Sequence, residues 1–166
     1  MKTICTFCNT VITEGIPEDN RVNHGVCQSC YRNILKNYGF NLQMFLNMLD
    51  APVLLVDADA RVLAANTLAI AAVGKPVDRV TGKLCGTVLD CINAFLPEGC
   101  GNTPECPDCT IRSTVNETFE TGRPVKHRRA TVIRKYNGTR ETVHLLVSTD
   151  KDGKVVLLRL EPANVA

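Results

Sequence analysis

Nine cysteines are the residues of this 166-residue chain with the clearest chemistry. A long stretch without cysteine divides them into two groups, which are Cys5, Cys8, Cys27 and Cys30, and then Cys85, Cys91, Cys100, Cys106 and Cys109. No apolar run reaches the length of a membrane helix or of a secretory signal, so we expect a cytoplasmic protein. A reducing cytoplasm does not maintain structural disulfides, which leaves metal binding or redox chemistry as the use of these thiols.

The first group consists of two Cys-x-x-Cys pairs, Cys5 with Cys8 and Cys27 with Cys30. This spacing is typical of a four-thiolate zinc site, in which two tight turns aim four sulfurs at one ion. Such a site has no open coordination position and is therefore structural. We expect a zinc-knuckle or ribbon module at residues 1–36 that depends on its metal for folding. His24 is expected to remain outside the ligand set, because four thiolates already satisfy zinc.

The second group predicts another four-thiolate site, with Cys91, Cys100, Cys106 and Cys109 as its ligands. Glycine and proline residues interrupt segment 85–109, so metal ligation would supply order that its backbone lacks. Either zinc or an iron-sulfur cluster suits four thiolates, and a disulfide that forms on oxidation is a third alternative. Cys85 is left over, either as a small buried apolar residue or as a fifth thiol that exchanges with a ligand.

Around the second cysteine group, the pattern of apolar and turn residues predicts an α+β domain. Apolar residues at helical spacing indicate an amphipathic helix over 41–50, which either packs on the domain or mediates dimerisation and signal transmission. Hairpin signals such as Asn137-Gly138 separate β-rich runs near the end of the chain. The predicted strands are 53–56, 61–64, 125–136, 140–148 and 155–160, and the main predicted helices are 67–73 and 110–121. We expect a five-stranded antiparallel sheet with helices on one face.

This order of elements resembles a PAS sensor domain. The residues that carry the resemblance are Ala51-Pro52-Val53-Leu54-Leu55-Val56-Asp57, Arg61-Val62-Leu63-Ala64-Ala65-Asn66, Gly82-Lys83 and the three final strands. It implies a PAS-like domain at 51–162, a linker or helix at 37–50, and a cysteine-rich insertion at 85–109 of the kind found in a cysteine-bearing bacterial subgroup. PAS domains are sensory or dimerising modules, so the resemblance implies a bacterial signalling protein that acts through a partner protein or a homodimer.

Composition and motifs argue against other functions. The net charge is only +2, so nucleic acid is not the expected partner. The chain has no Ser-His-Asp set, no phosphate-binding glycine loop and no HExxH motif, and we expect a protein that is not an enzyme. Two alternatives remain: a thiol-disulfide redox protein that uses Cys106 and Cys109, and a zinc-dependent nucleic-acid-binding adaptor. Basic residues such as Arg128 and Arg129 could neutralise a thiolate site or simply lie on a solvated strand.

Overall fold

The computed structural model describes residues 1–16, 19, 21–38 and 41–164. The chain forms two compact units, Met1–Leu42 and Gln43–Ala166. Within the described ranges, no helix has both the length and the apolar character needed to span a bilayer.

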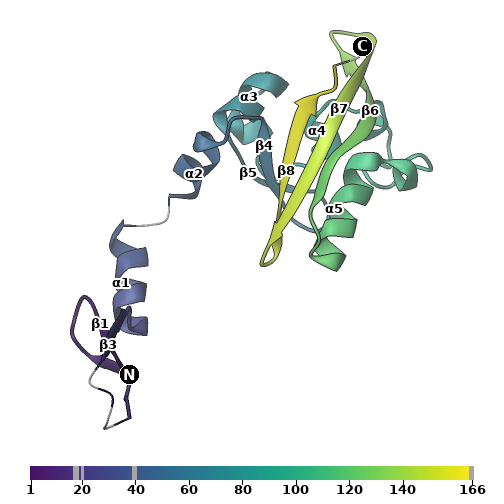
Figure 1. The fold of residues 1–166 in the computed structure, drawn as a ribbon. Coiled ribbons are helices and arrows are strands. Elements are labelled where there is room, and N and C mark those ends of the chain that lie inside the picture. The colour runs from purple at the N-terminus through teal and green to yellow at the C-terminus, as the bar shows by residue number, and fades with distance from the viewer. Residues whose placement is uncertain (17–18, 20, 39–40, 165–166) are drawn as a thin grey trace. The chain divides into compact units, whose positions relative to one another are not determined.

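The first unit contains a small sheet and one helix (Figure 1). Strand β1 (Lys2–Cys5) lies between β2 (Val11–Thr13), which is antiparallel to it, and β3 (Val22–Gly25), which is parallel to it. Helix α1 (Gln28–Tyr38) follows directly. The sequence analysis predicted none of these three short strands.

The side chains that the structure describes in this unit form almost no hydrophobic core. Among its described side chains, Cys5 is the only apolar one that is buried. Larger apolar side chains are exposed, including Phe7 at 63% and Ile16 at 71%. Burial of apolar surface is the main driving force for folding, so this unit needs another source of stability.

The second unit is built on one antiparallel sheet with the strand order β5-β4-β8-β7-β6. Its strands are β4 (Val53–Val56), β5 (Val62–Ala65), β6 (Val125–Tyr136), β7 (Thr139–Asp152) and β8 (Val155–Pro162). Figure 1 shows the long strands β6, β7 and β8 side by side, with α5 (Thr110–Thr121) next to them. The predicted strands and this predicted helix are therefore present.

Short helices connect the first hairpin to α5. They are α3 (Thr67–Val73), η1 (Val77–Arg79), α4 (Cys85–Val88), η2 (Ile92–Phe95) and η3 (Cys106–Asp108). One hydrophobic core joins these helices to alternate residues of the strands, such as Val156 and Leu158 of β8. The cysteine-rich segment therefore lies against this sheet and contributes Cys85 and Val88 to the shared core.

Asn66 connects three elements at the beginning of this unit. Its side-chain oxygen accepts hydrogen bonds from the backbone N–H groups of Val53 (3.0 Å) and Ala69 (2.9 Å), and so caps α3. Its amide nitrogen donates to the carbonyl oxygens of Leu46 (3.1 Å) and Ala51 (2.8 Å). The fully buried amide thus holds α2 (Leu42–Met48) to the sheet and to α3.

Candidate metal centres

The first cysteine group is gathered in one place. Cys5 ends β1, Cys8 follows in a turn, Cys27 precedes α1 and Cys30 lies in its first turn. The four sulfur atoms all lie within 4.8 Å of one another, and the sulfurs of Cys8 and Cys27 are 3.6 Å apart. Zinc bonded tetrahedrally to sulfur at about 2.3 Å requires sulfur separations of about 3.8 Å. The group therefore has the size of a site for one metal ion.

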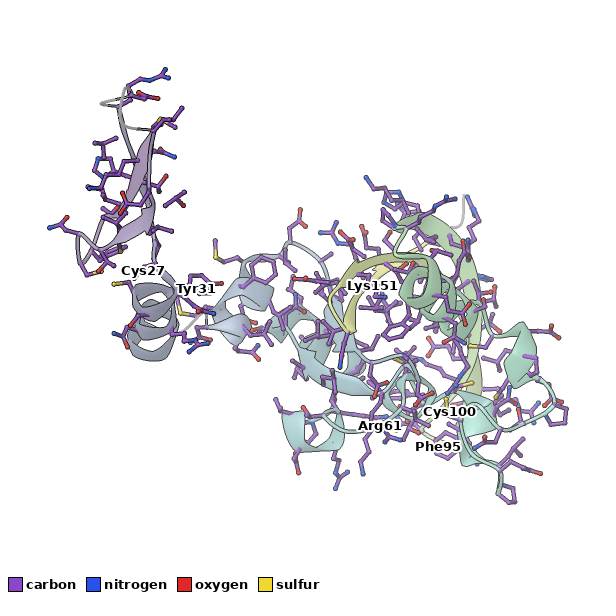
Figure 2. The ribbon with its side chains drawn as sticks, turned by 90° about the horizontal axis from the view of Figure 1, so that it is seen from below. Cys27, Tyr31, Arg61, Phe95, Cys100 and Lys151 are labelled. Carbon is purple, nitrogen blue, oxygen red and sulfur yellow. The ribbon has the colours of Figure 1, made fainter. Side chains whose placement is uncertain are left out.

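Hydrogen bonds hold the two turns of this group together. The backbone N–H of Thr6 donates to the carbonyl oxygen of Gly25 (2.9 Å), and the N–H of Cys27 donates to the sulfur of Cys5 (3.4 Å). Figure 2 labels Cys27 at the start of α1, with Tyr31 one turn further along the helix. His24 is exposed on β3 and does not belong to the group of ligand atoms.

Because the four sulfurs lie close together, their thiols differ in pKa. Hydrogen bonding from the backbone of Cys27 lowers the pKa of Cys5 to about 6. Contact with the thiols of Cys8 and Cys27 raises the pKa of Cys30 to about 12. Four negative charges cannot share this space without a cation. A divalent ion would remove the conflict and allow all four groups to be thiolates.

The second cysteine group surrounds one small cavity of about 50 Å³ in the other unit. All five of its members line this cavity, namely Cys85, Cys91, Cys100, Cys106 and Cys109. They come from α4, from the segment between α4 and α5, and from the residue before α5, and Cys100 is labelled in Figure 2. Ile111 of α5 and Val132 of β6 belong to the apolar part of the wall.

The sulfurs of this second group are spread more widely than those of the first. Among the residues that the structure describes, only the first group brings three or more ligand atoms within 4.8 Å of one another. One water molecule needs about 10–15 Å³ of space on the same measure, so the second cavity has room for several atoms. The predicted quartet is thus brought to one cavity, but not to the separations of a single-ion site.

Backbone and side-chain donors support individual sulfurs of the second group. The sulfur of Cys106 accepts a hydrogen bond from the N–H of Gly101 (3.2 Å) and lies 3.1 Å from the hydroxyl of Thr103. Burial raises the pKa of Cys106, but these hydrogen bonds and the charge of Arg112 outweigh burial and lower it overall. In contrast, burial raises the pKa of Cys91, and it raises that of Cys85 to about 12.

Two features of this cavity bear on the sequence expectations. The sequence left Cys85 either as a small buried apolar residue or as a fifth thiol; it belongs to the hydrophobic core, is 3% exposed and also lines the cavity. The arginine at the cavity is Arg112, whereas Arg128 forms an ion pair with Glu117 at 2.6 Å. The three-residue spacing between Cys109 and Arg112 was the available signal, because it places Arg112 in the first turn of α5 on the side of its N-cap residue Cys109.

A larger cavity of about 290 Å³ lies between the sheet and the helices α3 and α4. Its lining is mainly apolar and includes Leu54 and Val143. Leu89 and Val132 line both cavities and therefore separate them. The two charged pairs at the larger cavity, Lys75 with Asp90 and Arg134 with Glu141, are each 2.7 Å apart.

Comparison with solved structures shows the fold of the second unit. A variant of the protein RsLOV overlaps 75% of this chain and 66% of its own, with 14% identity and a TM-score of 0.51. The PAS domain of BvgS from Bordetella pertussis overlaps 74% and 84%, with 13% identity and a TM-score of 0.46. The PAS domain of an HTR-like protein from Haloarcula marismortui overlaps 78% of this chain and 100% of its own, with 13% identity and a TM-score of 0.48.

The second unit has a PAS-like fold. The resemblance read from the sequence and the expected α+β class are therefore confirmed, as is a four-cysteine group near the N-terminus. No family model and no curated protein matches the chain. At these identities the likeness is one of fold, so the function must be argued from the cysteines and their surroundings.

Proposed function

We propose that this protein is a bacterial cytoplasmic signalling module in which a PAS-like domain senses redox state or oxygen through an iron-sulfur cluster. The cluster is held by Cys91, Cys100, Cys106 and Cys109. A zinc ion at Cys5, Cys8, Cys27 and Cys30 folds the N-terminal module. The output passes to a partner protein or through a homodimer.

One observation carries the proposal, namely that five thiols separated along the chain line one internal cavity. A single ion needs all its sulfurs close together, whereas in a cluster the four thiolates are divided among two or four iron atoms. The wider spacing of the second group and its room for several atoms therefore favour a cluster over zinc. The N–H of Gly101 on the sulfur of Cys106 supplies the kind of hydrogen bond that tunes cluster potentials.

Zinc is proposed for the first group because its separations suit one tetrahedral ion. The same ion would supply the folding free energy that the module lacks, since Cys5 is its only buried apolar side chain among those described.

The burial of Cys106 argues against the thiol-disulfide alternative. Cys106 is 7% exposed and lines the cavity, so a protein substrate has little access to it. A buried cluster suits sensing instead, because a change in its charge or integrity alters the order of the segment that binds it.

Metal and sulfide analysis of anaerobically purified protein tests the proposal. We expect a coloured protein with iron and acid-labile sulfide in equal amounts, together with one zinc ion per chain. Cys100→Ser should remove iron and sulfide but keep zinc, while Cys8→Ser should remove zinc but keep iron and sulfide. A colourless wild-type protein that binds only zinc would refute the redox function.

A further inference from the structure

We propose that Arg112 compensates the negative charge of the centre bound in the second cysteine cavity and connects that centre to the turn between β4 and β5. This inference rests on the proposed function, because it concerns the regulation of the same site. Arg112 is the only charged residue among the described residues that line the cavity. Any thiolate-bound centre there is anionic, so its nearest cation should control how readily it gains or loses charge.

The guanidinium of Arg112 packs against the backbone of Gly101 at the cavity. A methyl group added to Gly101 would lie only 2.6 Å from the central carbon of the guanidinium, so the arginine packs directly against the glycine backbone. The same glycine donates its N–H to the sulfur of Cys106. Arg112 therefore touches the backbone that supports one of the proposed ligands.

The other contact of Arg112 is with the β4–β5 turn, residues 57–61. One of its terminal nitrogens donates to the carbonyl oxygen of Asp59 at 3.2 Å. The turn is built on the carboxylate of Asp57, which accepts hydrogen bonds from the N–H groups of Asp59 and Arg61, each at 2.9 Å. Arginine thus joins the cavity to a turn that is distant in sequence.

The turn also touches the cavity directly and contains an unusual residue. Ala60 lines the cavity, and its carbonyl oxygen accepts a hydrogen bond from the N–H of Cys85 at 2.9 Å. Its φ angle is +59°, a left-handed conformation that is costly for alanine. Figure 2 labels Arg61, which ends the turn, and Cys100 of the cavity. A change at the centre can therefore reach the strained β4–β5 turn through Arg112 and Asp59 or through Cys85 and Ala60.

Potentiometric titration of the full-length protein tests the charge effect. Loss of a nearby cation destabilises the more negative, reduced centre. In Arg112→Met, we expect the ratio of reduced to oxidised centre at a given potential to fall about tenfold, which is about 59 mV for one electron. Arg128→Met is the matched control, because it removes a cation that is paired with Glu117, and should leave the potential unchanged.

Hydrogen exchange tests the connection to the turn. Amides of residues 59–61 should exchange several-fold faster in Arg112→Met than in Arg128→Met. Arg112→Lys separates the two roles, since it keeps the charge without the planar donor group. We expect Arg112→Lys to restore most of the potential but not the protection of the turn.

The outcomes distinguish this inference from the proposed function. If the cavity binds iron and sulfide but Arg112→Met behaves like Arg128→Met, the inference is wrong and the function stands. If it binds zinc alone, the redox function is wrong, and faster zinc release to a chelator from Arg112→Met would still support the inference. A cavity that binds no metal, or equal zinc release from the two variants, overturns the inference.

Discussion

Substitution of Gly86 by alanine should damage the second cysteine cavity. Gly86 lies in α4, where alanine would favour the helix by up to about 1 kcal/mol if only propensity mattered. The new Cβ atom would lie 2.5 Å from the sulfur of Cys100 and 3.5 Å from the Cβ atom of Cys91. Normal contacts need about 3.5–4.0 Å, so the sulfur of Cys100 must retreat by roughly 1 Å.

The surrounding backbone leaves little freedom for this movement. The N–H of Cys91 donates to the carbonyl oxygen of Gly86 at 2.8 Å, which fixes the two segments together. Overpacking of this kind costs about 1–3 kcal/mol, more than the gain in helix propensity. We therefore expect Gly86→Ala to lower the free energy of unfolding of the second unit by about 1–2 kcal/mol and to displace one ligand of the centre.

Denaturant unfolding followed by circular dichroism measures the first effect, and metal and sulfide content measures the second. Thr87→Ala is the matched control, because Thr87 has an exposed side chain on the same helix and does not line the cavity. It should be neutral or slightly stabilising and should keep its metal. If Gly86→Ala is as stable as this control and binds the same metal, the sulfur of Cys100 is not packed against α4.

Three further predictions concern the metal, the core and the thiols. Cys27→Ser, or removal of zinc by a chelator, should abolish hydrogen-exchange protection in α1 without changing the melting temperature of the second unit. Asn66→Ala should lower the free energy of unfolding by about 3 kcal/mol, measured in denaturant, because the substitution leaves buried N–H and carbonyl groups unpaired. In metal-free protein, iodoacetamide should modify the exposed thiol of Cys8 at neutral pH. It should modify Cys85 only as the pH approaches 12, because the raised pKa of Cys85 keeps its thiol protonated at lower pH. Mass spectrometry of both sites measures the modification. Rapid modification of Cys85 at neutral pH would contradict its burial.

Local sequence signals predicted much of the second unit. The Asn137-Gly138 pair has the positive φ angles, +50° and +79°, that a tight hairpin turn requires. Asn66, a residue type that favours helix N-caps, directly precedes the predicted helix at 67–73, and its side chain caps α3. These features depend on residues that are neighbours along the chain, so a single sequence contains them. The bonds from Asn66 to Leu46 and Ala51 depend on the tertiary fold and were not predictable.

The short strands of the N-terminal module left no clear signal. Strand β2 has three residues and pairs with β1 across an irregular register, while β3 carries exposed residues such as Asn23 and His24. Apolar alternation is therefore absent, although it is the pattern by which strands are predicted. The spacing of the cysteines therefore predicts this module better than the pattern of its apolar residues does.

Cys85 illustrates why the second site was only partly predictable. The other four cysteines lie in segment 91–109, whose glycine and proline residues indicate a backbone that needs a bound metal to be ordered. Cys85 begins an ordinary helix and packs with Val88 and Ile111, so its sequence context matches that of a core residue. The structure shows that it occupies both environments. Spacing identifies ligands within one segment, whereas membership of a cavity depends on which segments the fold brings together.

The two cysteine groups should respond differently to loss of their metals, because their surroundings supply different amounts of folding energy. The first group provides the only buried apolar side chain among those described in its unit, so loss of its ion should unfold the unit. The second group borders a core that includes Leu54, Val147 and Leu158, and we expect the packing of this core to remain when the proposed centre is lost. Loss of the second centre should therefore loosen segment 91–109 while the sheet persists. A sensor needs this arrangement, since it must remain folded in both signalling states.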